Sequence, residues 1–511
     1  MADGGGSPSE RQRKRAKEVE DLWRAFGIEA NKAELMPEPS LASAELMPDA
    51  AGNLRLLQWN ILANGLSDDG FLVDDVLRDR PATQRTSHEI ACELRSCREA
   101  HADLDPDELK RELGALAEEL RNERTAKNHD AVLNWTLRWA QMRKFVALGR
   151  PHIITMQEVD CMAELQADLA ELGYSCGKPG MRHVPAHCCA TWSGTLARGQ
   201  VNKDAKAYLK HLHDVGVAFA PKTQSNARQF ALKRGMPNAD DDGVAIFWRN
   251  DALELQELDF LCLDDKKRNQ GAVKVKLRRR EDDATIVVIS AHLSSGTTAK
   301  DEAIRVKELG EKSWRAEDVS RPDEPCCGRT GPSLGEWIEA AAAVGPTLLC
   351  LDANTRPDQR HASSATGGTV WQTLRSRLAS VWDAYFDAQG HPAPQHSGAM
   401  PVTTNKMRGP LSSQPKKMGE HVFGVVDHIY FNSLFRMTRH VWGPLTFPNE
   451  EEALGELLPT PECPSDHTPV MVDMCLPLSR SKAVGARKAA DVRDGGRSIR
   501  YGGKSGCCVT M

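Results

Sequence analysis

Short apolar runs, each with an acid, an amide or an imidazole in it or at its end, recur along this 511-residue chain. Residues 347–351, for example, form a short apolar run bounded by polar residues, which is typical of a buried strand. The polar residues of this pattern are Asn60, Glu158, His292, Asp352, Asn354, Asp427, Asp466 and His467. Because catalytic groups in sheet proteins gather in the loops at one end of the strands, we expect these side chains to meet at one site.

Segments whose apolar residues have helical spacing lie between many of the apolar runs. We expect helices over residues 9–26, 88–98, 106–121, 133–148, 163–172, 298–312 and 334–344. We expect strands over residues 54–59, 152–157, 244–248, 272–277, 286–290, 347–351, 422–431 and 470–474. Helices interleaved with buried strands predict an α/β protein.

Composition limits the classes of protein that this chain can belong to. Hydrophobic residues make up 40% and charged residues 27%, so a sizeable core can form. The net charge of −5 gives no overall attraction for nucleic acid, and any site for a polyanion must therefore be local. We expect no transmembrane segment, no secretion signal and reduced thiols, since the 14 cysteines include no Cys-x-x-Cys pair.

The types of the eight polar residues indicate a particular chemistry. Carboxylate and amide oxygens without thiolates suit Mg²⁺ or Mn²⁺ better than Zn²⁺. Mg²⁺ needs only one or two protein carboxylates, and it completes its shell with water and substrate phosphate. The pattern therefore predicts metal-assisted attack of water on a phosphate ester.

Seven short motifs carry a resemblance to a known family. They are Trp59-Asn60-Ile61-Leu62, Gln157-Glu158-Val159-Asp160, Asp242-Gly243-Val244-Ala245-Ile246-Phe247, Ala291-His292-Leu293, Asp352-Ala353-Asn354, Asp427-His428-Ile429-Tyr430 and Ser465-Asp466-His467. In this order they resemble the endonuclease/exonuclease/phosphatase superfamily, and most of all its deadenylase branch of nocturnin and CCR4-type proteins. The resemblance covers roughly residues 54–476.

The resemblance implies a fold and a metal site. The fold would be a four-layer α/β/β/α sandwich of two packed mixed β-sheets, with the site at one edge. Glu158 would bind Mg²⁺ (or Mn²⁺), with Asn60 beside it, and Asp466 would complete the side of the site that holds the metal and the nucleophile.

The resemblance also implies catalytic roles for the remaining residues. Asp352 would activate or orient the attacking water, and Asn354 would hold a phosphoryl oxygen or the nucleophile. His292 and His467 would contact the scissile phosphate and stabilise its charge in the transition state. Asp427 would orient His467 through a hydrogen bond.

The implied activity is that of a 3′-exoribonuclease acting on RNA 3′ ends or poly(A). The alternatives are a nocturnin-like phosphatase for the 2′-phosphate of NADP(H), another phosphomonoesterase such as an inositol phosphatase, and an inactive, membrane-tethered binding module. Lys406, Arg408, Lys416 and Lys417 lie in a stretch that we expect to be a loop, and they could supply cations to a phosphorylated substrate. The motifs do not separate these substrates, because the chemistries share one site.

The two ends of the chain differ in composition from the middle. We expect a flexible appendage over residues 1–50, a catalytic domain over 51–477 with insertions near 64–130 and 310–340, and a basic flexible tail over 478–511. Cys508 is fourth from the end and the last residue is Met, which is typical of farnesylation, and Cys507 could be palmitoylated. We therefore expect a cytoplasmic protein that reaches membrane surfaces through this lipid.

Overall fold

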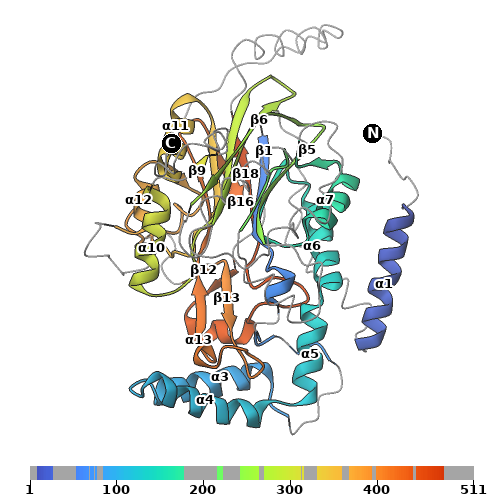
Figure 1. Cartoon of the computed structure of the whole chain (residues 1–511), viewed down its shortest axis with the longest axis vertical. Coiled ribbons are helices and arrows are strands. Elements are labelled where there is room, and N and C mark those ends of the chain that lie inside the picture. The colour runs from blue at the N-terminus through green and yellow to red at the C-terminus, as the bar shows by residue number, and fades with distance from the viewer. Residues whose placement is uncertain are drawn as a thin grey trace, which may run out of the picture.

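Two mixed β-sheets pack face to face at the centre of the described domain (Figure 1). The computed structural model describes residues 9–26, 53–67, 70–73, 75–77, 84–177, 216–222, 242–263, 270–311, 314–315, 331–358, 368–393, 399–440 and 445–476. Most of the expected N-terminal appendage and the tail with Cys507 and Cys508 lie outside these residues. Among the described helices, none combines the length and the apolar character that crossing a membrane requires.

The first sheet joins segments from both ends of the described domain. Its strands, in spatial order, are β16 (Arg436–His440), β18 (Val470–Cys475), β1 (Asn53–Asn60), β2 (Ile153–Val159), β5 (Gly243–Arg249) and β3 (Tyr174–Ser175), with β4 (Phe219–Pro221) also paired to β5. Strands β1 and β2 are parallel, whereas β18 runs antiparallel to β1. The start of β18 therefore lies at the same edge as the carboxyl ends of β1 and β2.

The second sheet repeats this arrangement. In spatial order it contains β11 (Ala379–Ser380), β15 (Asp427–Phe431), β10 (Thr347–Asp352), β8 (Thr285–His292), β7 (Gly271–Arg279), β6 (Leu253–Cys262) and β9 (Trp314–Arg315). Strands β8 and β10 are parallel, and β15 is antiparallel to β10. The start of β15 thus lies beside the carboxyl ends of β8 and β10.

Helices cover the outer face of each sheet. Helices α6 (Trp135–Gly149) and α7 (Met162–Glu171) pack on the first sheet, and α10 (Ala299–Gly310), α11 (Leu334–Val344) and α12 (Val370–Arg375) pack on the second. Figure 1 shows these helices on opposite sides of the paired sheets. The expected four-layer sandwich is confirmed.

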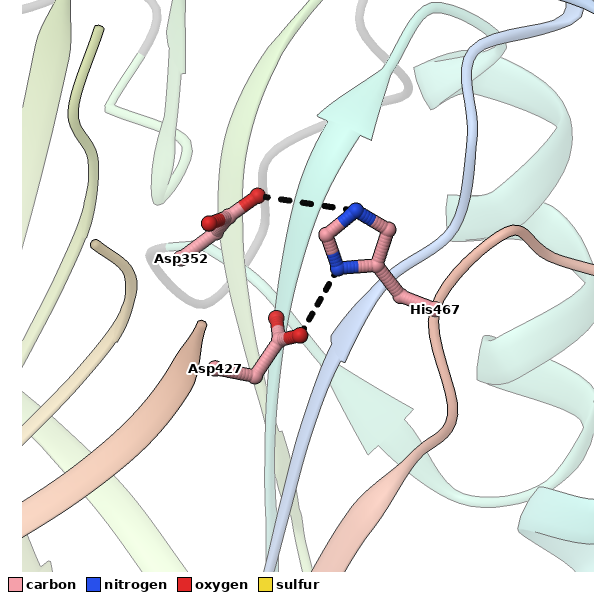
Figure 2. A group of neighbouring side chains, drawn as sticks. All are labelled: Asp352, Asp427 and His467. Atoms are coloured by element: carbon pink, nitrogen blue, oxygen red, sulfur yellow. Dashed lines mark hydrogen bonds and ion pairs between the residues drawn. The ribbon is translucent and has the colours of Figure 1, made fainter. Parts of the chain in front are cut away.

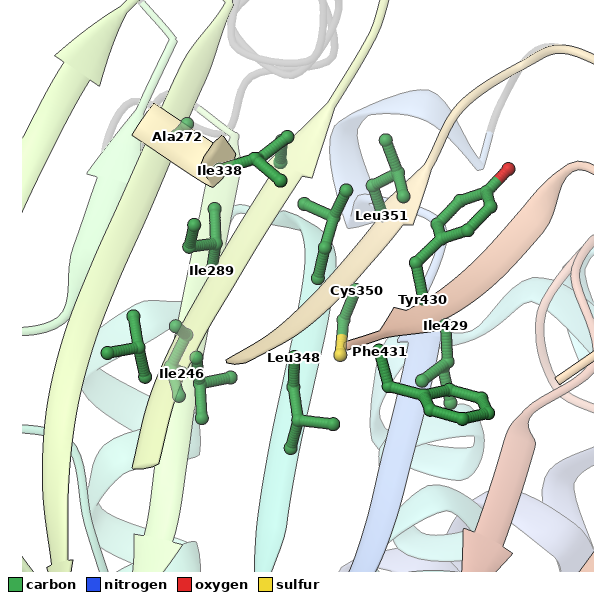
Figure 3. Packing of buried hydrophobic residues seen from close by; sticks show 14 of the residues in the cluster. Ile246, Ala272, Ile289, Ile338, Leu348, Cys350, Leu351, Ile429, Tyr430 and Phe431 are labelled. Carbon is green, nitrogen blue, oxygen red and sulfur yellow. The ribbon is translucent and has the colours of Figure 1, made fainter. Parts of the chain in front are cut away.

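Apolar side chains fill the space between the sheets (Figure 3). Ile246 of β5, Val288 of β8 and Leu348 of β10 are fully buried members of this core. Burying a side chain of this size contributes about 1.5–3 kcal/mol relative to exposure. Strands β8 and β10 are buried along almost their whole length because α10, α11 and α12 cover their other face, which explains their continuous apolar runs.

The first helix, α1 (Glu10–Phe26), confirms the helix expected at residues 9–26. It lies against the sandwich and not apart from it. Arg11 and Arg15 both form ion pairs with Asp168 of α7, which is almost completely buried. Three apolar residues of the helix pack against a small cluster that includes Leu137 of α6.

The insertion near residues 64–130 forms a separate layer beside the site. It contains η1 (Asn64–Leu66), α3 (Ser87–Ala100), α4 (Pro106–Leu120) and α5 (Glu123–Leu133). Its neighbours are β12 (Met400–Val402), β13 (Thr404–Met407), η5 (Pro415–Lys417), β14 (His421–Gly424), β17 (Leu445–Phe447), α13 (Glu450–Ala453) and η6 (Leu454–Glu456). In Figure 1 this group lies below the sheets.

Local side chains explain where the insertion helices start. Thr86 accepts a hydrogen bond from the backbone N–H of Glu89, and the Glu89 carboxylate accepts one from the N–H of Thr86. This capping box satisfies two backbone donors that the helix itself cannot. Asp105 caps α4 in a similar way, and Pro106 occupies the first helical position, where its missing N–H costs nothing.

Three expectations about local structure are wrong. The single strand expected over 422–431 is two strands, β14 and β15, because Gly424 has a φ of +146° and turns the chain between them. Lys406 lies in strand β13 and not in a loop. The helix expected from residue 133 starts at Trp135 because Asn134 caps it. Strand β6 was not expected at all.

Candidate active site

The strand ends of both sheets meet at one edge, as the sequence pattern predicts. Asp352 is the last residue of β10, and in the strand ladder it lies opposite His292 of β8 and Asp427 of β15. In the other sheet Asn60 ends β1 beside Gln157 of β2. The contacts described below link all eight polar residues of the pattern into one continuous group.

Asn60 joins two carboxylates that come from different sheets. Its amide nitrogen donates hydrogen bonds to Glu158 Oε1 at 3.1 Å and to Asp352 Oδ2 at 2.9 Å. Its amide oxygen accepts a hydrogen bond from the backbone N–H of Leu62 at 3.0 Å, which fixes the orientation of the amide. Asn60 therefore holds Glu158 and Asp352 on either side of one nitrogen atom.

Three residues of this edge have left-handed backbone conformations, which cost energy outside glycine. They are Leu62 with φ +52°, Glu158 with φ +57° and Asn354 with φ +49°. At Glu158 the pairing of β2 with β5 shifts register, so the bulge turns the carboxylate toward the site. Conformations of this kind cost about 1–3 kcal/mol each and cluster at functional sites.

The buried carboxylates fit a divalent cation. Burial and the nearby Asp466 raise the pKa of Glu158, and burial and Asp427 raise the pKa of Asp352. Such groups keep their charge at low cost when a cation lies between them. Ligand atoms of Asp352, Asp427 and His467 also lie within 4.8 Å of one another. Glu158 and Asp352 are the pair that could hold a divalent cation, because Asp427 and His467 already bind each other.

His467 and Asp427 form a buried ion pair (Figure 2). His467 Nδ1 donates a hydrogen bond to Asp427 Oδ2 at 2.7 Å, and the indole N–H of Trp59 donates to the backbone carbonyl of His467 at 2.9 Å. Burial alone would lower the pKa of His467, but the carboxylates of Asp427, Asp466 and Asp352 together outweigh burial and raise this pKa to about 9. His467 is then protonated at neutral pH, and its Nε2 lies 3.9 Å from Asp352 Oδ2.

His292 has the opposite protonation state. Burial, with Lys222 and His467 nearby, lowers the pKa of His292 well below its usual value, so the ring is neutral at pH 7. Its Nε2 lies 3.2 Å from the amide nitrogen of Asn354 and 3.4 Å from Asp352 Oδ2. The site thus contains one cationic and one neutral imidazole on either side of the same carboxylate.

Lys406 forms an ion pair with Asp466 at the open side of the site. Burial would raise the pKa of Asp466, but the positive charges of Lys406, His467 and Arg138 together outweigh burial and lower this pKa to about 2. The Lys406 ammonium nitrogen also lies 3.3 Å from His467 Nε2. Lys406 therefore neutralises Asp466 while adding positive charge beside the protonated imidazole.

The sequence did not predict two further charged side chains of the site, which are those of Lys222 and Arg138. Lys222, just after β4, forms a buried ion pair with Asp242 Oδ2 at 2.7 Å. Burial opposes the charge of Lys222, yet Asp242 and Glu158 together raise its pKa. A Lys directly after a short strand resembles any surface residue in the sequence, and the pairing of β4 with β5 brings it to the site.

Arg138 of α6 is the second group that the sequence did not reveal. It is fully buried and donates hydrogen bonds to the backbone carbonyls of Ile61, Leu62 and Pro464. Burial lowers the pKa of Arg138 to about 10. Arg138 thereby ties the loop after β1 to the loop that carries Asp466 and His467.

A pocket of about 620 Å³ opens onto this site. Its lining includes Asn354, His467, Lys406 and Arg408 from the predicted site. The other lining residues are Ser295, Gly296, Thr297, Thr298, Asp301, Arg356, Thr404, Lys417, Glu420, His421, Val422, Phe423 and Val426. The volume suits a nucleotide-sized ligand.

Comparison with known proteins adds one relative by sequence. No family model matches the chain. Nocturnin from Drosophila melanogaster is 23% identical over 278 residues. The alignment covers 52% of this chain and 37% of that relative, so the chain spans little more than a third of the relative's length.

Solved structures show a distant likeness. The human Nocturnin catalytic domain with bound sulfate has a TM-score of 0.41 at 16% identity, covering 83% of this chain and 94% of that one. ANGEL2, described as a 2′,3′-cyclic phosphatase, has a TM-score of 0.43 at 15% identity, covering 83% and 95%. The chain is thus similar in sequence to a nocturnin, and its two packed sheets agree with the sandwich that the motif resemblance implies.

Proposed function

We propose that this chain is a divalent-metal-dependent hydrolase of phosphoric esters, and more narrowly a phosphodiesterase that removes nucleotides from RNA 3′ ends. One observation carries this proposal. Carboxylates from two sheets, a protonated His467 and a neutral His292 converge at one edge, and His467 also lines the adjoining pocket with Lys406 and Arg408. This combination provides a cation site, a group to orient water and donors for phosphoryl oxygens.

The metal would be Mg²⁺ or Mn²⁺, held by Glu158 with Asn60 and Asp466 beside it. When bound, such an ion supplies positive charge to the phosphoryl oxygens. The raised pKa values of Glu158 and Asp352 support this assignment, because a nearby cation would relieve the repulsion that the buried carboxylates experience.

The protein's own side chains would orient the attacking water and contact the phosphoryl oxygens. Asp352 accepts a hydrogen bond from Asn60 and lies 3.4 Å from His292, so it is placed to orient an attacking water. Protonated His467 would donate from Nε2 to a phosphoryl oxygen, while Asp427 keeps the ring in place through Nδ1. Asn354, whose amide donates to the backbone carbonyl of Leu293 at 3.0 Å, would contact a second oxygen.

A second candidate is a phosphatase for a free phosphorylated nucleotide such as NADP(H). One contact fits this candidate as well as it fits the exonuclease: Thr297 Oγ1 donates a hydrogen bond to Glu420 Oε1 at 3.3 Å, and both residues line the pocket. This contact joins two sides of the pocket that come from distant parts of the chain. A pocket whose two sides are bridged in this way admits a nucleotide or the end of a strand more easily than the middle of a polymer.

The experiment that tests the proposal offers 5′-labelled oligo(A) and NADPH in parallel to the purified protein with Mg²⁺. A ladder of shortened RNA supports the exonuclease, and phosphate release from NADPH without a ladder supports the nucleotide phosphatase. Glu158→Ala should abolish either activity, whereas Glu171→Ala, which removes a carboxylate from the end of α7, should not. If the protein hydrolyses neither substrate, both activities are refuted, and the remaining hypotheses are an inositol phosphatase or a tethered binding module.

We also propose a farnesyl group on Cys508, with Cys507 as a palmitoylation site and a membrane surface as the resulting partner. This proposal rests on the sequence alone, because both residues lie outside the described part. Labelled farnesyl should enter the wild-type protein and the Cys507→Ser variant but not Cys508→Ser. Incorporation into Cys508→Ser, or none into the wild type, refutes it.

A further inference from the structure

One side of the substrate pocket is a loop that the chain's own insertion holds in place. The loop runs from residue 408 to residue 420, between β13 and β14, and we call it the wall loop. Three of its residues, Arg408, Lys417 and Glu420, line the pocket. The pocket can therefore keep its shape only if this loop is ordered.

Helix α3 of the insertion is hydrogen-bonded to the C-terminal part of the wall loop. The Arg98 guanidinium donates hydrogen bonds to the backbone carbonyls of Lys416 at 3.0 Å and Met418 at 3.2 Å. Gly419 has a φ of +70°, and a Cβ at this position would lie 2.7 Å from the backbone oxygen of Leu94 in α3. Only glycine allows the loop to approach the helix so closely in this conformation.

Helix α4 adds an apolar anchor and a second arginine. The Met418 side chain is 2% exposed and packs against Leu113 and Ala117 of α4. Arg121, which follows α4, donates a hydrogen bond to the backbone carbonyl of Pro410 at 3.0 Å. The insertion thus holds the wall loop near its beginning and near its end.

The stretch before α3 supports the cations themselves. The backbone N–H of Gly409 donates to the carbonyl of Gly70 at 2.7 Å, which aligns the two segments. The Phe71 ring then lies 5.8 Å from the Lys406 ammonium nitrogen and 5.7 Å from the Arg408 guanidinium carbon. Cations at this distance from a ring face are attracted to it, so Phe71 restricts where both side chains can point.

We infer that the insertion is a specificity element, which places Arg408 and Lys417 to bind a second anionic group of the substrate beside the scissile phosphate. The inference rests on the proposed function only for the position of the scissile phosphate near His467. Arg408 and Lys417 lie on the wall loop, outside the carboxylate cluster, and both line the same pocket as His467. Arg98, Gly419 and Phe71 are positioning residues, because they act through the wall loop and touch no reacting group.

The test uses inorganic pyrophosphate as the probe and the full chain as the protein, with calorimetry as the readout. Arg98→Ala should weaken pyrophosphate binding by about tenfold, since a small displacement of binding groups has effects of this order or larger. Arg95→Ala is the matched control, because Arg95 lies on the same helix but pairs with Glu99 and Glu451. The control should bind pyrophosphate within about twofold of the wild type, as expected for an exposed ion pair.

Two substrates separate this inference from the proposed function. For bis(p-nitrophenyl) phosphate, a diester that has no second anionic group, Arg98→Ala should leave KM and kcat unchanged. For a substrate with a second phosphate it should raise KM and leave kcat unchanged, as loss of uniform binding does. If neither substrate is hydrolysed, the proposed function is refuted, but pyrophosphate binding still tests the inference about the wall loop.

The inference is overturned if the wild type does not bind pyrophosphate, or if Arg98→Ala and Arg95→Ala bind it equally well. If Arg98→Ala does not fold, Phe71→Leu takes its place, because leucine keeps apolar bulk but removes the ring beside Arg408. Phe71→Leu should then weaken pyrophosphate binding relative to Arg95→Ala. Equal binding by these two variants also overturns the inference.

Discussion

Replacing Arg138 with Met should separate the two loops of the active site. In the wild type, Arg138 donates to the carbonyls of Ile61, Leu62 and Pro464, and its side chain is fully buried. Each buried carbonyl that loses its donor costs about 1–3 kcal/mol. Removing the guanidinium from the interior returns several kcal/mol of desolvation. We therefore expect the free energy of unfolding to fall by about 3 kcal/mol, near the lower end of the sum for three carbonyls.

Urea unfolding, followed by tryptophan fluorescence, measures this change. Arg143→Met is the matched control, because Arg143 lies on the same helix and forms a partly exposed ion pair with Glu171 at 3.3 Å. The control should lose less than about 1 kcal/mol. If Arg138→Met is as stable as Arg143→Met, the three hydrogen bonds do not hold the loops and the reasoning is refuted.

Two further predictions concern the site and the sheet edge. Asp427→Asn should lower kcat by about 10²–10⁴-fold with little change in KM, because His467 loses its orienting partner, and steady-state kinetics would test this. An unchanged kcat would contradict the role of Asp427. Although burial opposes it, hydrogen bonds from Arg55 and Arg439 lower the pKa of Asp473. The stability that Asp473 contributes is present above its unfolded pKa and is lost as pH falls through the lower folded value. Asp473→Asn should therefore show a smaller loss of stability on acidification from about pH 5 to pH 3 in urea titrations, and an unchanged loss would contradict this.

The fold could be predicted from local patterns because its main strands are buried on both faces. Strand β10 appears in the sequence as an uninterrupted apolar run, and the polar residue at its end, Asp352, is conspicuous for that reason. The ordered motifs then identified the superfamily fold, which the two-sheet sandwich confirms. The catalytic and metal-binding roles of the site residues stay predictions.

Other features depend on contacts between distant parts of the chain. Arg138 and its partner Pro464 are 326 residues apart, and nothing in the helical pattern around Arg138 distinguishes it from a solvent-exposed arginine. The break after Gly424 depends on a positive φ that the apolar run through 422–431 hides. The hydrogen bonds between α3 and the wall loop join two segments that lie about 320 residues apart in the sequence.

The central claim is that the strand ends form one site that uses a divalent cation to cleave a phosphoric ester. The most direct measurement is the hydrolysis of bis(p-nitrophenyl) phosphate by the wild type and by Glu158→Gln, in EDTA and after Mg²⁺ is added back. We expect turnover that EDTA abolishes, that Mg²⁺ restores and that Glu158→Gln reduces by about 10²-fold or more. Turnover that persists in EDTA, or that is equal in Glu158→Gln, would contradict it, as would a wild type that is inactive with Mg²⁺.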